Sequence, residues 1–181
     1  MNYAKIIPFD LANGNGIRVS LFVSGCEFHC PGCFNVDAQA FDFGKTYSEI
    51  SENKILNLLD NSYVRGLSIL GGDPLWQDDS GLQDLISLVA KTHKLGKDVW
   101  LWSGFTWESV MNCAMIHRIY QRDLVSCIHQ RELVALCDVF IDGPFIEDKK
   151  DLSLHWRGSS NQRVIDVKES LKQNKVILYT D

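Results

Sequence analysis

A chain of 181 residues is long enough for one domain to bury about two-thirds of its unfolded surface without disulfide or metal staples. Its composition, 45% hydrophobic and 23% charged, is that of a globular protein and excludes a largely disordered one. The formal net charge of −5, with no block of Lys or Arg, argues against a nucleic-acid-binding protein.

Short β-type runs alternate with helix-type runs along the chain. Strands are predicted, in order, at 17–23, 66–70, 98–102, 138–141 and 175–179, with a weaker candidate at 163–167. Helices are predicted at 48–60, with Thr46 and Glu49 spaced as a capping box, around 82–89 with Gly96 as the stop, and twice within 106–136. The last stretch is long enough to be a helical insertion.

This alternation predicts parallel strands joined by right-handed crossovers, hence an α/β fold. Five or six such strands are too few for a closed eight-stranded barrel. We therefore expect a single domain over residues 1–181, built as a partial (βα) barrel or an open curved sheet of mostly parallel strands. In both architectures the site forms beyond the carboxyl ends of the strands.

The cellular compartment bears on the six cysteines. No apolar run approaches the roughly 20 residues of a membrane span, and residues 1–5 lack the basic-then-apolar order of a signal peptide. These features favour a cytoplasmic protein without membrane partners, where disulfides are rare. The cysteines then need another explanation.

Three of the cysteines form the pattern C-x3-C-x2-C directly after the first predicted strand, in a loop spanning 24–35. They are Cys26, Cys30 and Cys33, and Gly25, Pro31 and Gly32 supply the tight turns between them. Thiolates suit iron–sulfur clusters, zinc or Cu(I). Three ligands leave one iron of a [4Fe–4S] cluster open for chemistry. A structural zinc site usually has four protein ligands, and no second C-x2-C pair follows in this sequence. A zinc site and inert buried thiols nevertheless stay open as alternatives.

The order of motifs resembles one branch of the radical S-adenosylmethionine (SAM) superfamily, the anaerobic ribonucleoside-triphosphate reductase-activating proteins. Besides the cysteine loop, the resemblance rests on four segments: 13–18 (NGNGIR), 71–75 (GGDPL), 142–145 (DGPF) and 156–162 (WRGSSNQ). It runs from Met1 to about Val167.

The resemblance implies a [4Fe–4S] cluster on Cys26, Cys30 and Cys33 that reductively cleaves SAM and so places a glycyl radical on the partner reductase. It also implies a reducing partner such as a flavodoxin. Activation of another glycyl-radical enzyme, modification of a small molecule, and a noncatalytic zinc-binding adaptor remain as alternatives.

Several further residues are expected to bind SAM on this resemblance. Carbonyls of Gly71 and Gly72 would accept hydrogen bonds from its ammonium group, and Asp73 would add an opposite charge. Ser103 and Asp142 end strands where a ribose or methionine moiety would lie, although each fits an ordinary turn as well. The residue before the third cysteine, often aromatic in this superfamily, is Gly32, and Phe34 is the substitute expected against the adenine. The segment 156–162 is either a docking loop or a packed one.

Overall fold

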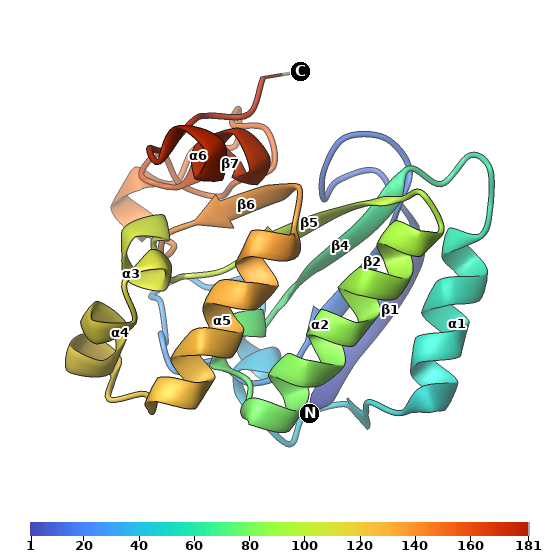
Figure 1. The fold of residues 1–181 in the computed structure, drawn as a ribbon, viewed down its shortest axis with the longest axis horizontal. Coiled ribbons are helices and arrows are strands. Elements are labelled where there is room, and N and C mark those ends of the chain that lie inside the picture. The colour runs from blue at the N-terminus through green and yellow to red at the C-terminus, as the bar shows by residue number, and fades with distance from the viewer. Residues whose placement is uncertain (181) are drawn as a thin grey trace.

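A computed structural model describes residues 1–180, and its centre is one seven-stranded mixed sheet (Figure 1). The strand order is β3-β1-β2-β4-β5-β6-β7. Strands β2, β4, β5 and β6 are parallel, whereas β1, β3 and β7 pair antiparallel with their neighbours. The strands are β1 (Asn2–Asp10), β2 (Arg18–Val23), β3 (Lys45–Thr46), β4 (Gly66–Gly71), β5 (Asp98–Trp102), β6 (Val139–Asp142) and β7 (Arg163–Asp166).

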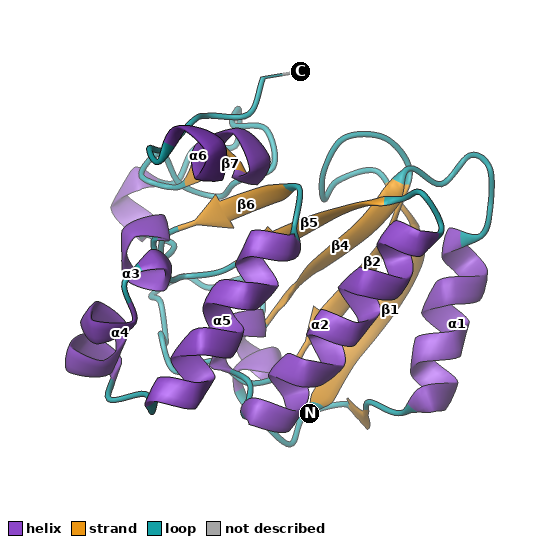
Figure 2. Cartoon of the chain, viewed as in Figure 1, coloured by secondary structure: helices purple, strands orange, loops and turns teal. Residues whose placement is uncertain are grey.

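Helices cover one face of this sheet, with α1, α2 and α5 side by side in front of the strands in Figures 1 and 2. The α-helices are α1 (Glu49–Leu59), α2 (Asp79–Lys94), α3 (Trp107–Met111), α4 (Cys113–Tyr120), α5 (Leu124–Leu136) and α6 (Val167–Gln173); short 3₁₀ turns, η1 (Val36–Gln39), η2 (Pro74–Trp76) and η3 (Glu147–Lys149), lie between them. Among residues 1–180, none of the helices is long and apolar enough to cross a membrane.

The two faces of the sheet bury different side chains because residues alternate along each strand. Val19, Leu21 and Val23 of β2 belong to the large core beneath the helices. The other face carries a smaller cluster around Trp100 of β5 and Ile141 of β6. This second face is the one that borders the site.

A buried arginine organises the second face near the start of the parallel strands. Arg18 is fully buried, pairs with Asp98, donates to the Ser68 hydroxyl at 2.7 Å, and lies 5.2 Å from the Trp100 ring centroid. The Ser68 hydroxyl in turn donates to the carbonyl of Asn13 at 2.5 Å. The hairpin between β1 and β2 is thereby folded over this face instead of extending into solvent.

Most predicted elements are confirmed, and the differences are local. There are seven strands instead of five or six; four of the seven are parallel, and β1, β3 and β7 pair antiparallel toward the two edges of the sheet. The predicted strand at 175–179 is wrong: only a single bridge joins Ile165 to Leu178. Helix α1 is capped by Ser48 with Ser51, not by Thr46 with Glu49, since Thr46 pairs in β3.

The segment 106–136 contains three helices where two were predicted. Asn112 interrupts the pattern, because it ends α3 and its side chain accepts a hydrogen bond from Met115 N at 3.2 Å to begin α4. An amide side chain that satisfies a free backbone N–H favours a new helix start at that position.

Candidate active site

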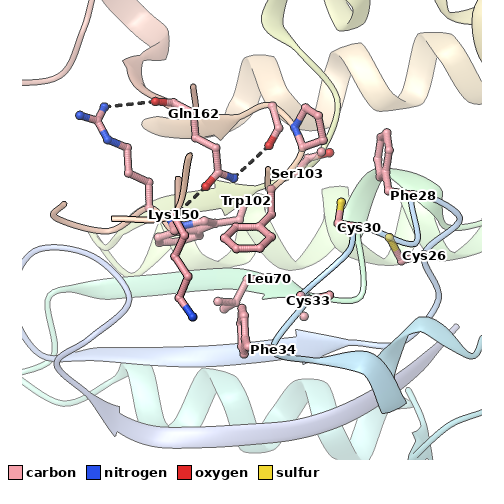
Figure 3. Close-up of a pocket in the computed structure, with 18 of the residues that line it drawn as sticks. Cys26, Phe28, Cys30, Cys33, Phe34, Leu70, Trp102, Ser103, Lys150 and Gln162 are labelled. Atoms are coloured by element: carbon pink, nitrogen blue, oxygen red, sulfur yellow. Dashed lines mark hydrogen bonds between the residues drawn. The ribbon is translucent and has the colours of Figure 1, made fainter. Parts of the chain in front are cut away.

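A cavity of about 540 Å³ opens beyond the carboxyl ends of β2, β4, β5 and β6. Its wall contains all three cysteines of the loop, as well as Gly71, Gly72 and Ser103. Figure 3 shows Cys26, Cys30 and Phe28 on one side of the cavity and Trp102, Lys150 and Gln162 on the other. Residues far apart in sequence thus converge where parallel strands end.

Backbone hydrogen bonds hold the cysteine loop. Gly25 N donates to Ala38 O at 2.8 Å, and Cys26 N donates to Gln39 O at 3.0 Å, so η1 and the residues after it brace the start of the loop. Gly25 has a φ of 101°, and a Cβ there would overlap the Phe41 ring. A side chain at this position would therefore push the loop away from its brace.

The three thiols are free and half-buried. Burial, and next the nearby Asp73, raises the pKa of Cys26 to about 12; burial likewise raises the pKa of Cys30. Charge repulsion adds to these effects, because Cys30 and Cys33 raise the pKa of Cys26 and Cys33 raises the pKa of Cys30. A raised pKa means that Cys26 and Cys30 bind a proton or a strongly cationic centre in preference to remaining unpaired thiolates.

The turn after β4 lies directly against the cysteine loop. Gly72 N donates to Val23 O at 2.7 Å, and Asp73 N donates to Gly25 O at 2.8 Å. A Cβ on Gly72 would lie 2.6 Å from the Gly25 carbonyl oxygen. Only glycine permits this approach, which joins the two predicted motifs into one wall of the cavity.

Asp73 ties two strand ends together and does not line the cavity. Its buried carboxylate accepts from the Ser103 hydroxyl at 2.9 Å, from Gly104 N at 2.7 Å and from Leu75 N at 2.8 Å. Burial raises the pKa of Asp73 to about 6, against the lowering effect of these donors. Asp73 therefore fixes the backbone of the 103–104 turn, and the Ser103 hydroxyl, which also accepts from Phe105 N, is occupied.

The carboxylate of Asp142 is likewise engaged in hydrogen bonds within the protein. This buried carboxylate accepts from Trp107 N at 2.8 Å and pairs with Arg163, which bridges on to Glu108. These carboxylates raise the pKa of Arg163. Gly143, and not Asp142, is the residue of this turn that lines the cavity.

Comparison with known proteins agrees with this geometry. Residues 12–165 match the family model of a single-cluster 4Fe–4S domain. The anaerobic ribonucleoside-triphosphate reductase-activating protein of Escherichia coli K12 is 38% identical over 168 residues, covering 91% of this chain and 97% of the relative. The proteins of the same name from Vibrio cholerae and phage T4 are 37% and 36% identical, covering 90% and 91% of this chain and 96% and 93% of the respective relative. The chain belongs to this family of activating proteins.

The residues fit the iron–sulfur cluster that the family implies. Among residues 1–180, no three Cys, His, Asp or Glu side chains gather closely enough to hold a single metal ion. A four-iron cluster needs no such gathering, because each cysteine binds a different iron and the sulfurs stand farther apart than around one zinc. The three thiols line one cavity and form no disulfide, as a cluster site requires.

The lining of the cavity is more aromatic than the sequence indicated. Gly32 lines the cavity with a φ of 71°, and Phe34 lines it from the rim with 83% of its surface exposed. Sequence reasoning missed three further aromatic residues in the wall, Phe28, Trp102 and Phe145. Position at the end of a strand was an available signal for Trp102, whereas Phe28 and Phe145 lie inside the 24–35 loop and the 142–145 motif and were assigned no role there.

The segment 156–162 is a packed loop in this family member. The Gln162 side chain accepts from Gly158 N at 2.9 Å and donates to Gly143 O at 2.9 Å, and Asn161 donates to Pro144 O at 2.8 Å. Trp156 O accepts from the Trp102 indole at 2.7 Å. The donors expected to meet a partner are largely used to fix this loop over the strand ends.

Proposed function

We propose that the protein activates an anaerobic ribonucleoside-triphosphate reductase, holding a [4Fe–4S] cluster on Cys26, Cys30 and Cys33 and SAM in the adjoining cavity. The observation that carries the proposal is the convergence of these cysteines and the glycine turn after β4 on one cavity at the ends of parallel strands. Membership of the family of reductase-activating proteins supports the same partner.

Cys26, Cys30 and Cys33 would hold the cluster, which would supply the electron for reductive cleavage of SAM and so allow a hydrogen atom to be taken from a glycine of the reductase. The protein's own contribution is placement and exclusion of water. Three thiolates leave one iron without a protein ligand. Phe28, Trp102 and Phe145 give the cavity an apolar lining, which would protect a reactive species from solvent.

We assign two kinds of SAM-site residue. Gly32, Cys33, Phe34, Gly71, Gly72 and Ser103 line the cavity and are proposed to contact SAM, the glycines through backbone atoms. Asp73 and Asp142 are proposed to act from behind, because their carboxylates hold the turns at Gly104 and Trp107. These two residues are positioning residues in the sense that they act through other groups.

The remaining assignments follow from the same architecture. We infer a single domain over residues 1–181 of the partial (βα) barrel type, with the cluster loop at 24–35 and a helical insertion at 106–136. We infer that it works in the cytoplasm with a reducing protein such as a flavodoxin, and without nucleic acid or membrane, in keeping with its net charge of −5.

Anaerobic reconstitution tests the proposal. After loading with iron and sulfide, reduction and addition of SAM, equimolar 5′-deoxyadenosine and methionine are expected. Cys30→Ala should abolish both products, whereas Cys127→Ala, which changes a buried cysteine on α5, should retain them. Uptake of zinc without sulfide, or full cleavage by Cys30→Ala, would overturn the assignment.

A further inference from the structure

Four aromatic rings meet behind the cysteine loop, and one of them belongs to the loop. Phe28, between Cys26 and Cys30, packs edge-on against Trp76, Phe105 and Tyr120, with ring centroids 5.6, 5.0 and 5.9 Å away. Phe105 and Tyr120 are themselves 4.6 Å apart. Edge-to-face pairs of this kind add orientation as well as burial. Tyr120 is the last residue of α4, so the helical segment 106–136 reaches the cysteine loop directly.

A second contact from the same junction reaches the backbone on both sides of the site. Arg122, in the turn between α4 and α5, donates to the carbonyl of Gln77 at 2.5 Å, and its guanidinium lies 5.5 Å from the Trp76 ring centroid. The buried side chain of Gln77 donates to the carbonyls of Ser24 and Asp73, both at 3.0 Å. Ser24 begins the cysteine loop, and Asp73 ends the glycine turn.

The charge of Arg122 is used in an uncommon way. None of the ion pairs formed by residues 1–180 includes Arg122, so its charge-assisted hydrogen bond goes to a main-chain carbonyl. The surrounding packing also leaves buried polar atoms without a protein partner: Arg122 Nε, Trp76 Nε1 and Gln130 Oε1.

We propose that the α4–α5 junction is a positioning support for the cluster, in which Tyr120 holds Phe28 and Arg122 holds Gln77, so that the cysteine loop and the glycine turn keep one relative geometry. This inference rests on the proposed function and gives the segment 106–136 a task within it. Tyr120 and Arg122 act through other residues and line no part of the cavity.

The test measures how fast an iron chelator removes the cluster from the reconstituted full-length protein, under anaerobic conditions. Arg122→Met keeps the length of the side chain and removes the donor, Tyr120→Leu removes the ring, and Arg118→Met is the matched control on an exposed position of α4. Loss of a charge-assisted hydrogen bond predicts about tenfold faster cluster loss in Arg122→Met. Tyr120→Leu should accelerate it about fivefold, and Arg118→Met should leave it within about twofold of wild type.

Urea denaturation of the apoprotein separates positioning from general stability. We expect Arg122→Met to lower the urea midpoint by much less than the free-energy change that corresponds to its faster cluster loss. Arg122→Lys restores a charged donor, so its rate of cluster loss should return part of the way to the wild-type rate. Unchanged cluster loss in both junction variants would overturn the inference while leaving the proposed function intact. The inference would also be overturned if the unfolding free energy of the apoprotein fell by as much as the increase in the rate of cluster loss corresponds to. A wild-type protein that takes up no iron and sulfide would overturn both.

Discussion

Asp73 offers a test of how the two halves of the site are joined, through the pH dependence of folding. Its carboxylate is fully buried, and burial raises its pKa to about 6 from an ordinary value of 3.8. The folded protein therefore binds this proton more tightly than the unfolded chain does. The resulting stability is complete below the unfolded pKa and is lost as pH rises through about 6.

The magnitude follows from the shift. Each unit of pKa difference is worth about 1.4 kcal/mol, so the full effect is about 3 kcal/mol. Between about pH 4.5 and about pH 7.5, the titration of Asp73 removes about 2 kcal/mol of this stabilisation. Asp73→Asn has no titrating group at this position and lacks that component. The unfolding free energy of wild type minus that of Asp73→Asn should therefore decrease by about 2 kcal/mol over this range.

Urea unfolding of the apoprotein, followed by the fluorescence of its five tryptophans, provides the measurement. Asp42→Asn, at an exposed loop position, is the matched control for the loss of one carboxylate. A constant difference between wild type and Asp73→Asn across the range would refute the reasoning. A difference that increases with pH would do so as well, since it would mean a lowered pKa.

Three further substitutions test other parts of the account. Gly71→Ala should lower the unfolding free energy measured in urea by about 2–4 kcal/mol, because φ is 122° and a Cβ would overlap the backbone of β2. The control Gly96→Ala, with a φ of 72° and open space around it, should lower it by about 1 kcal/mol. Arg163→Met should cost about 3–5 kcal/mol, because it strands the buried carboxylate of Asp142, and adding Asp142→Asn should recover part of that loss. Cys127→Ala should lower the melting temperature slightly and leave SAM cleavage within about twofold of wild type; a large loss of activity would give this cysteine a role.

The parallel centre of the fold and the edge strand β7 were predictable, whereas β1 and β3 at the other edge were not. Strand β5 was predicted at its observed bounds because a short apolar run between turn residues is typical of a buried strand. Strand β1 was missed: it contains Pro8, lies near the sheet edge, and has mostly half-buried or exposed residues, so no alternation marks it. The 175–179 run is apolar enough for a strand, but it pairs with β7 only through one antiparallel bridge, between Ile165 and Leu178.

Spacing along the chain identified the cysteines and glycines of the site but not the tasks of the acidic residues. Three cysteines within eight residues and two glycines at a strand end carry their meaning locally. The partners of Asp73 and Asp142 lie about 30 and 20–35 residues away in sequence, so their burial and saturation by protein donors depend on tertiary structure. The same holds for Phe28, whose contacts on Trp76 and Tyr120 no sequence pattern indicates.

The most direct test of the central claim is electron paramagnetic resonance of the reductase after anaerobic incubation with this protein, SAM and a reductant. We predict a glycyl radical signal on the reductase that requires the loaded cluster, disappears with Cys30→Ala and persists with Cys127→Ala. A signal of equal size with Cys30→Ala, or cleavage of SAM by the wild-type protein with no radical on the reductase, would contradict the account.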